Sequence, residues 1–161
     1  MALRSARHLT SVYLVRQGSV LLLYRRGSRA IADSWVGIGG HVEPGELTDP
    51  TAAALRELDE EIGVTADHLT DLALRYVAVR DTGAEIRTTY YFTANLRPTA
   101  PLPTECTEGD LRWFELTTDP TQLDMPPTAR LAFAHWLSTG RHDDALRLIT
   151  VDADGRATGP L

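Results

Sequence analysis

Three glutamates recur at helical spacing in the segment 39–64, which reads GGHVEPGELTDPTAAALRELDEEIGV. At about 100° per residue, Glu57 and Glu61 lie about 40° apart around a helix, and Glu60 lies about 60° to the other side of Glu57. Carboxylate oxygens gathered in this way are ligands that Mg²⁺ or Mn²⁺ prefers. Such an ion can neutralise a polyphosphate and activate an attacking water. The spacing therefore indicates metal-dependent chemistry at phosphorus.

A solvated acidic face is the competing interpretation of the same helix. Like charges at these spacings repel by only ~0.2–0.5 kcal/mol per pair on an exposed helix, and Arg56 can offset that repulsion. Gly39 and Gly40 precede the helix and form a turn without side chains, where a backbone carbonyl can approach an ion. The helix alone leaves both interpretations open, and the glycine turn favours the metal site.

A helix over residues 50–62 must carry the three glutamates. Thr48-Asp49-Pro50 reads as its start, with a capping side chain and then proline near the first helical position, and Gly63 is suited to end it. Ala53 and Ala54 are expected beside the glutamates, where they leave room. The residues expected to pack on a sheet are Thr51, Leu55, Leu58 and Ile62.

Alternating apolar, aromatic and β-branched residues predict strands on both sides of this helix. The predicted strands are 10–17 and 20–25 joined by Gly18-Ser19, 72–81 and 85–96 joined by a turn at 81–84, and 111–116. A second helix is expected over 126–139, an exposed proline-rich loop over 97–110, and a strand, an Asp-Ala-Asp-Gly turn and a frayed end in the tail. These elements predict a single mixed α/β domain over 1–161, with a core at about 8–140 and a C-terminal strand and tail at 141–161.

Composition narrows the class of protein. The chain has 161 residues, 43% of them hydrophobic, and a net charge of −6, which suits an ordinary globular domain and argues against a broad nucleic-acid-binding surface. Cys106 is the only cysteine, so a disulfide within the chain and a cysteine-rich zinc site are both excluded. The sequence has no apolar run of the ~20 residues that a membrane-spanning helix needs. We expect a cytoplasmic protein with a small anionic substrate.

The glutamate segment resembles the Nudix box, the signature of Nudix hydrolases. That pattern is glycine, five residues, glutamate, seven residues, arginine-glutamate, an aliphatic residue, any residue, two glutamates, any residue, glycine and an aliphatic residue. The matching residues here are Gly40, Glu46, Arg56-Glu57-Leu58, Glu60-Glu61 and Gly63-Val64. Nine residues instead of seven separate Glu46 from Arg56, and we place the two extra residues in the turn around 48–51. The resemblance covers most of the chain and implies an α/β/α sandwich with a mixed sheet.

The resemblance implies a role for each matching position. Glu57, Glu60 and Glu61 would bind Mg²⁺ or Mn²⁺, with the carbonyl of Gly40 as a further ligand. Arg56 would orient a box glutamate, and Glu46 would brace Arg56. Water would attack a phosphorus of a diphosphate linkage in a nucleotide or related compound. Glu57, Glu60 or a loop residue would act as base, and the loop candidates for completing the metal site are Glu105 and Glu108, which the sequence does not separate.

Candidate substrate contacts lie close to the box. Trp35 precedes it as in the branch of the family that removes oxidised purine nucleotides, so its ring is expected either to stack on a base or to pack in the core. Arg25 and Arg26 are candidates for phosphate contacts, with solvated arginines as the alternative. Gly39 and His41 belong to the box loop and are candidates for contacts to the phosphates, with a surface or structural histidine as the favoured alternative for His41. The late aromatic-acidic segment of enzymes that act on oxidised guanine has no clear counterpart in LDMPPTAR.

Two rival functions remain open on the sequence. A non-catalytic nucleotide sensor would commonly lack box glutamates, all of which are present here. An isopentenyl-diphosphate isomerase would need a cysteine within its own motif, which Cys106 matches poorly. Many relatives pair, so a homodimer is an expectation from the family alone.

Overall fold

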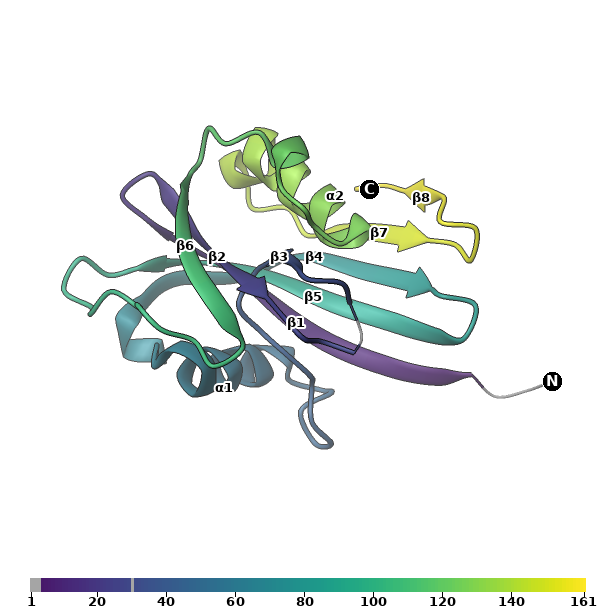
Figure 1. Cartoon of the computed structure of the whole chain (residues 1–161), viewed down its shortest axis with the longest axis horizontal. Coiled ribbons are helices and arrows are strands. Elements are labelled where there is room, and N and C mark those ends of the chain that lie inside the picture. Colours follow the sequence, from purple (N-terminus) through teal and green to yellow (C-terminus); the bar gives the residue numbers. More distant parts are fainter. Residues whose placement is uncertain (1–3, 30) are drawn as a thin grey trace.

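The computed structural model describes residues 4–29 and 31–161. Its elements follow one another from an N-terminal hairpin through two helices to a C-terminal hairpin (Figure 1). The strands are β1 Ser5–Arg16, β2 Ser19–Arg25, β3 Ser34–Val36, β4 Leu69–Asp81, β5 Glu85–Leu96, β6 Gly109–Glu115, β7 Arg147–Val151 and β8 Ala157–Thr158. The α-helices are α1 Pro50–Ile62 and α2 Pro127–Ser138, and short 3-10 turns lie at Ala66–His68, Pro120–Gln122 and Gly140–His142.

A mixed sheet organises the described part of the chain. Its strand order is β3-β2-β1-β5-β4-β7-β8, and β6 pairs with β2 outside this path. The β1–β5 and β4–β7 pairs are parallel, and the other strand pairs are antiparallel. One edge of β2 pairs first with β1 and then with β3. The chain after β3 returns to β1, where Ile38 pairs with Val12 and His41 with Leu9.

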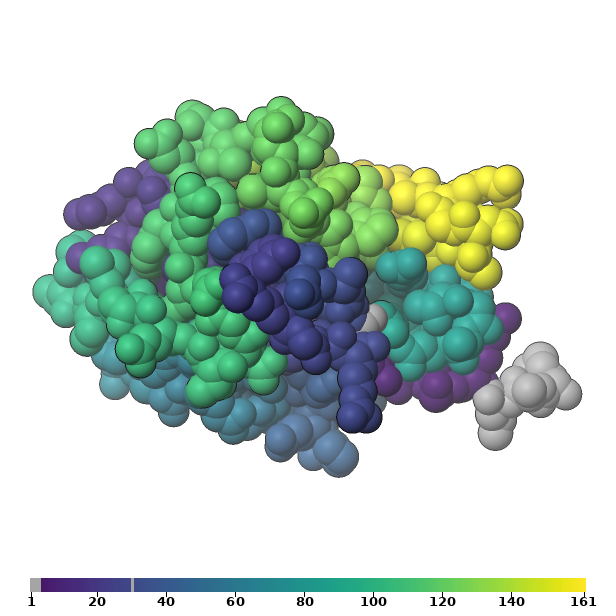
Figure 2. Space-filling model, in the orientation of Figure 1, coloured from purple at the N-terminus to yellow at the C-terminus, as the bar shows by residue number. Residues whose placement is uncertain are grey.

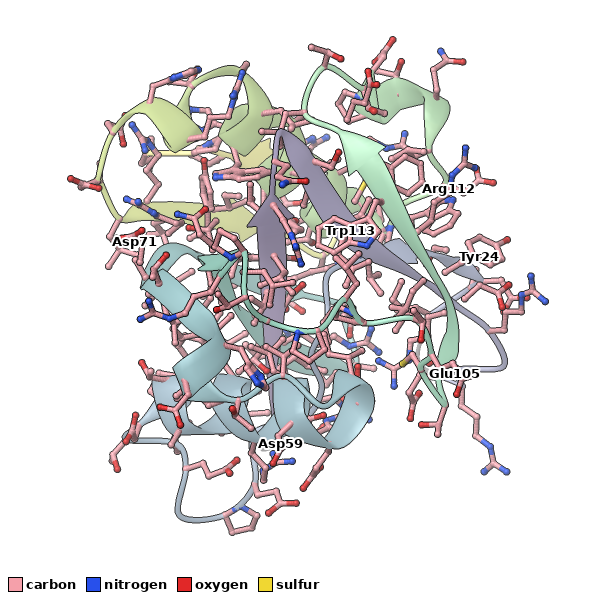
Figure 3. The ribbon with its side chains drawn as sticks, turned by 90° about the vertical axis from the view of Figure 1, so that its left-hand side faces the viewer. Tyr24, Asp59, Asp71, Glu105, Arg112 and Trp113 are labelled. Carbon is pink, nitrogen blue, oxygen red and sulfur yellow. The ribbon has the colours of Figure 1, made fainter. Side chains whose placement is uncertain are left out.

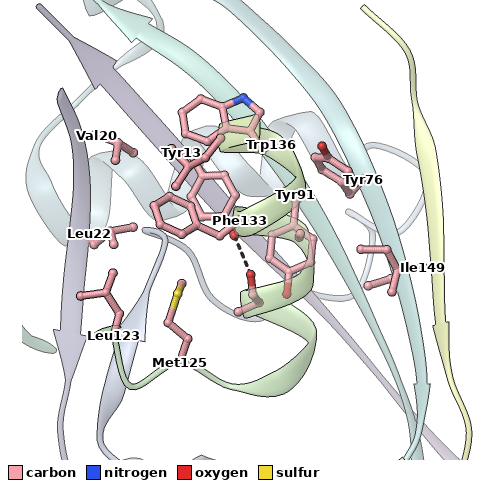
Figure 4. Packing of buried hydrophobic residues seen from close by; sticks show 14 of the residues in the cluster. Tyr13, Val20, Leu22, Tyr76, Tyr91, Leu123, Met125, Phe133, Trp136 and Ile149 are labelled. Atoms are coloured by element: carbon pink, nitrogen blue, oxygen red, sulfur yellow. Dashed lines mark hydrogen bonds between the residues drawn. The ribbon is translucent and has the colours of Figure 1, made fainter. Parts of the chain in front are cut away.

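Each face of the sheet is covered by one of the α-helices, as the α/β/α sandwich requires (Figure 1). Under α2, Tyr13 stacks on Trp136 and donates a hydrogen bond from its hydroxyl to the carbonyl of Ala129 (Figure 4). The cluster under α1 contains Leu58 together with alternate residues of β1 such as Val12. The period-2 alternation of β1 therefore supplies both cores. The predicted fold class is confirmed.

Helix α1 begins and ends as the sequence predicts, and two alanines are buried in addition to most of the residues expected to pack. Asp49 accepts a hydrogen bond from the amide of Ala52 as N-cap, and Gly63 closes the helix with φ +68°. The fully buried residues are Ala53, Ala54 and Leu58, whereas Thr51 is exposed. The prediction that Leu55, Leu58 and Ile62 pack on the sheet is confirmed, because all three contact the core under α1. Only the assignment of Thr51 to this face was wrong.

Other departures from the sequence predictions are local. The strands at 34–36 and 157–158 were not predicted, and β1 and β4 begin five and three residues earlier than expected, at Ser5 and Leu69. The proline-rich segment was expected to be exposed, yet its Ala100 is only 8% exposed and joins the core under α1. The chain end was expected to fray, yet the amide and carbonyl of Leu161 both pair with Leu148. No described helix is long and apolar enough to cross a membrane.

Candidate active site

Arg56 is the centre of the acidic cluster on α1. Its guanidinium contacts both carboxylate oxygens of Glu46, at 2.7 Å and 3.0 Å, and one oxygen each of Glu57 at 2.9 Å and Glu60 at 3.0 Å. It also donates to the carbonyl of His41. One arginine thus links the box loop to three helix and loop carboxylates. Its two parallel hydrogen bonds to Glu46 form a bidentate pair, which is among the strong charge-assisted interactions.

Glu46 keeps its reach to Arg56 despite the two extra residues. The chain turns tightly over residues 44–48, with the amide of Glu46 bonded to the carbonyl of Glu43 and the amide of Asp49 bonded to the carbonyl of Glu46. The helix then starts at Pro50. The hydrogen bonds from Arg56 lower the pKa of Glu46 to about 2, so this carboxylate stays ionised throughout the neutral range.

The three box glutamates on α1 have different surroundings. The side chain of Glu57 is 12% exposed and that of Glu60 is 60% exposed. Burial raises the pKa of Glu57. Burial, followed by the nearby charge of Glu57, raises the pKa of Glu61 to about 8, against the smaller opposing effects of Arg25 and of the Gly39 amide. One oxygen of Glu61 is buried without a hydrogen-bond partner among the described residues, so the charge of this carboxylate is only partly compensated.

The backbone at Gly39 and Gly40 separates α1 from the other face of the sheet. A Cβ on Gly40 would lie 2.7–2.8 Å from the carboxylate atoms of Glu57. A Cβ on Gly39 would lie 2.0 Å from the carbonyl oxygen of Thr10. Gly39 therefore requires glycine because rigid backbone lies against it, whereas at Gly40 the missing side chain leaves room for the Glu57 carboxylate. The carbonyl of Gly40 accepts a hydrogen bond from the amide of Thr10 at 2.8 Å.

The loop before β6 brings one of its two candidate acids toward the box. Glu108 lies 3.0 Å from the Arg25 guanidinium, and its charge contributes to the raised pKa of Glu61. Glu105 is exposed and lines a surface hollow together with Glu61 and Cys106. Figure 3 shows Glu105 beside the start of β6, at the end of this strand nearest α1. Both acids thus lie near Glu61, and Glu108 is the one paired with a site arginine.

The two candidate phosphate-binding arginines lie in different places. Arg25 lines a cavity of about 120 Å³ that is also lined by Gly39 and Gly40. Arg26 is exposed and pairs with Asp110 at 2.6 Å, outside that cavity. The structure therefore brings Arg25, and not Arg26, to the glycine loop.

Trp35 and His41 occupy structural positions. The Trp35 ring packs edge-on against Phe114, with ring centroids 4.8 Å apart, and against Tyr24. It belongs to the margin of the core under α2 and does not line the cavity. The His41 ring is exposed, and its carbonyl is the group that Arg56 contacts.

Sequence reasoning missed the other walls of the cavity. Arg80 and Arg87 pair across the β4–β5 hairpin, and Thr128 and Ala129 lie in the first turn of α2. The predicted turn at 81–84 already places the two arginines near one another. Nothing local to the sequence, however, places the start of α2 beside them.

The acidic residues fit a divalent cation, although they do not enclose one. Within residues 4–29 and 31–161, no group of three His, Cys, Asp or Glu side chains is arranged to hold an ion, and Arg56 occupies one oxygen each of Glu57 and Glu60. The unpartnered oxygen of Glu61, beside Glu57, is nevertheless the kind of hard donor that Mg²⁺ and Mn²⁺ take. Such an ion would also relieve the repulsion between these two carboxylates.

Comparison with known proteins places this geometry in a family. The NUDIX domain model matches residues 6–136. The chain belongs to the NUDIX family. It is 33% identical over 118 residues to an oxidized purine nucleoside triphosphate hydrolase of Danio rerio, covering 72% of this chain and 70% of that protein. The predicted family and the prediction of a hydrolase are confirmed.

Solved structures show the same fold. A mutator MutT protein from Bacillus halodurans superposes with a TM-score of 0.68 at 24% identity, covering 95% of both chains. A NUDIX hydrolase from Nitrosomonas europaea superposes with a TM-score of 0.73 at 16% identity, covering 94% of this chain and 81% of that one. A bifunctional NMN adenylyltransferase/ADP ribose pyrophosphatase from Francisella tularensis gives a TM-score of 0.65 at 18% identity, covering 86% of this Nudix hydrolase and 42% of that chain.

Proposed function

We propose that this Nudix hydrolase is a pyrophosphohydrolase that uses Mg²⁺ or Mn²⁺ to cleave the diphosphate linkage of a nucleoside polyphosphate or a related nucleoside diphosphate derivative. One observation supports this most strongly. The buried, unpartnered oxygen of Glu61 lies near Glu57 and beside a glycine loop that also borders a cavity lined by Arg25. A carboxylate is costly to bury without a partner, so the arrangement favours a site completed by a cation.

Glu57, Glu60 and Glu61 would hold the ion, with Glu108 and the carbonyl of Gly40 as further ligands. When bound, the ion supplies charge neutralisation at the diphosphate and polarises its phosphorus–oxygen bonds. Glu105 remains a candidate ligand through the hollow that it shares with Glu61.

The remaining chemistry is assigned to residues of this chain. An oxygen of water bonds to one phosphorus, and the bridging oxygen leaves with its electron pair as part of the second phosphate. A carboxylate receives the proton of the attacking water, and Glu57, Glu60 and Glu108 are the candidates for this base. Arg25 would contact a phosphate oxygen from the cavity side of the glycine loop. Arg56 and Glu46 would fix the position of Glu57.

The choice of a nucleoside compound is supported by the compounds for which two similar proteins are named. The Danio rerio protein is named for oxidized purine nucleoside triphosphates, and the Francisella tularensis protein for ADP ribose. Both substrates contain a nucleoside joined to a diphosphate. We therefore propose that shared chemistry for this chain.

The test is phosphate or pyrophosphate release from a panel of nucleoside triphosphates, dinucleotides and sugar nucleotides, each assayed with Mg²⁺, with Mn²⁺ and with a chelator. Glu60→Gln and Glu61→Gln should each lose most turnover while remaining folded, because they remove ligands and not packing. Asp59→Asn is the matched control, since this exposed acid lies on the outer side of the same helix (Figure 3). Full activity in both glutamine variants, or undiminished activity with chelator, would refute the proposal.

A further inference from the structure

The cavity beside the glycine loop is positively charged in a protein of net charge −6. Among the described residues, its lining includes Arg25, Arg80 and Arg87 and includes no aspartate or glutamate. Its apolar part comes from side chains such as Ala78 and Tyr91. The cavity is open to anions and unsuited to cations.

Arg80 is the unusual member of this group. It is half-buried, and the part of the chain that the structure describes offers its guanidinium no hydrogen bond or ion pair. The acids of its own hairpin are already engaged, because Glu85 pairs with both Arg87 and Arg7, and Asp81 pairs with Arg4. Asp33 and Asp124 line the adjoining hollow with Arg80 but form no ion pair with it. None of the nitrogen atoms of Arg80 is among the buried, unpartnered atoms of the described residues, so the guanidinium is open to water and to an anion from outside.

The strand register also places like charges beside Arg80. Arg80 lies directly opposite Arg87 across the β4–β5 pair, and Arg7 lies opposite Arg87 on β1. Three like charges therefore form a row across three neighbouring strands, with Glu85 as the carboxylate that bridges two of them. Like charges directly opposite one another destabilise a sheet. A ligand anion between Arg80 and Arg87 would remove that repulsion.

The first turn of α2 adds two further features on the opposite wall. The amides of Thr128 and Ala129 have no carbonyl four residues back within the helix, and no side chain in the described part of the chain caps this end. The Thr128 side chain is 8% exposed, and its hydroxyl oxygen has no partner among the described residues. The positive end of a helix and an unsatisfied buried hydroxyl thus line the same cavity as Arg80.

The position of Arg80 separates this end of the cavity from the scissile linkage. Arg80, Arg87 and Pro126 also line a second, adjoining hollow that Gly39 and Gly40 do not line. That hollow lies between the segment joining β2 to β3 and the β4–β5 hairpin, which flank a recess on the face in Figure 2. Arg80 therefore lies toward the far end of the cavity from the glycine loop.

We infer that the substrate carries a second anionic group, a phosphate monoester or a carboxylate, remote from its diphosphate, and that Arg80, the start of α2 and Thr128 bind it. This inference rests on the proposed function, because it specifies the substrate of the same site. A cavity of about 120 Å³ suits a compact group, since pockets that enclose a drug-sized ligand measure about 300–1,000 Å³.

The test is binding of inorganic phosphate and, separately, acetate to the metal-free protein, followed through the backbone amide resonances of Thr128 and Ala129. Both resonances should shift on titration with at least one of these anions. The anion that binds more tightly identifies the class of group. Arg80→Gln should weaken binding by about tenfold or more, as expected for a lost charge-assisted hydrogen bond. Arg80→Lys should recover part of this loss, and Thr128→Val should weaken binding to a smaller degree.

Arg112→Gln is the matched control, because it removes the same charge from an exposed residue of β6 that does not line the cavity (Figure 3). It should leave anion binding unchanged. An equal loss in Arg112→Gln and Arg80→Gln would indicate a general charge effect and overturn the inference. Shifts of the two amides with a neutral nucleoside but with neither anion would overturn it as well, since the cavity would then bind a base.

The two proposals fail differently. Anion binding that depends on Arg80, without turnover of any compound in the panel, would refute the pyrophosphohydrolase and leave the anion site standing. Turnover with Mg²⁺, together with anion binding that is absent or indifferent to Arg80→Gln, would refute the anion site alone.

Discussion

Glu61→Gln should stabilise the metal-free protein at pH 8 while abolishing most of its activity. Glu61 has a usual pKa of about 4.5, and burial raises it to about 8 in the folded chain. Because the folded pKa is the higher one, the stability associated with this group is fully present below about pH 4.5 and is lost as pH rises toward 8. Full burial would make the loss about 5 kcal/mol, and partial access of water reduces it to about 2 kcal/mol.

Glutamine retains the shape of the side chain and the oxygen that accepts the Gly39 amide, but it cannot ionise. Urea unfolding in chelator should therefore show Glu61→Gln about 2 kcal/mol more stable than wild type at pH 8, with the two nearly equal at pH 4. Excess Mg²⁺ should stabilise wild type and not the variant, because only the wild-type site binds the ion. Equal stabilities at pH 8 in chelator, or a gain that persists at pH 4, would contradict the assignment of a buried carboxylate with one unpartnered oxygen. Asp59→Asn is again the control and should show neither effect.

The remaining predictions concern the loop and its brace. Gly40→Ala should fold with a stability change of about 1 kcal/mol or less but lose about 100-fold in kcat, because the new Cβ displaces the flexible carboxylate end of Glu57; near-normal kcat would show that this contact is unimportant. Gly39→Ala meets rigid backbone instead, so thermal denaturation should show a loss of about 3 kcal/mol or failure to fold, and a wild-type Tm would disprove the clash. Glu46→Gln weakens the bidentate pair with Arg56 and should raise the Mg²⁺ concentration needed for half-maximal activity about 10- to 100-fold. Since the pKa of Glu46 is about 2, its carboxylate should remain ionised in the wild-type protein down to about pH 3. An activity loss near pH 5 that vanished in Glu46→Gln would contradict this.

The sequence was sufficient for the elements whose signals are local. Asp49, Pro50 and Gly63 mark the two ends of α1, and the turn at 81–84 marks the β4–β5 hairpin, because capping and turn chemistry act within a few residues. The pairing of Glu46 with Arg56 could be proposed from the box spacing alone. The spacing did not establish that pairing across the two extra residues, because loop geometry decides it.

The orientation of α1 required knowledge of what it packs against. Hydrophobic periodicity assigned Thr51 to the sheet and the alanines to the margin, whereas Ala53 and Ala54 are fully buried. Since Glu57 and Glu61 lie between these alanines in angle around the helix, they are drawn toward the glycine loop and lose water. The raised pKa of Glu61 is a consequence of this close packing, which the side-chain hydrophobicities do not encode.

The cavity could not be predicted because its walls come together only through tertiary structure. Arg80 is brought there by β-pairing, Arg25 by the end of β2, and Thr128 by the docking of α2 on the sheet. Each residue has an ordinary sequence context. Their common property, a missing acceptor or a shared positive charge, exists only after folding.

The backbone of Gly39 and Gly40 lies between two regions of opposite charge, the acidic cluster on α1 and the basic cavity. Arg25 is the side chain that lies near both regions. Substitutions that line the basic cavity can therefore change which compound binds, while the acidic cluster continues to catalyse the same reaction. A lineage built in this way would be expected to diversify in what it degrades far faster than in how it degrades it.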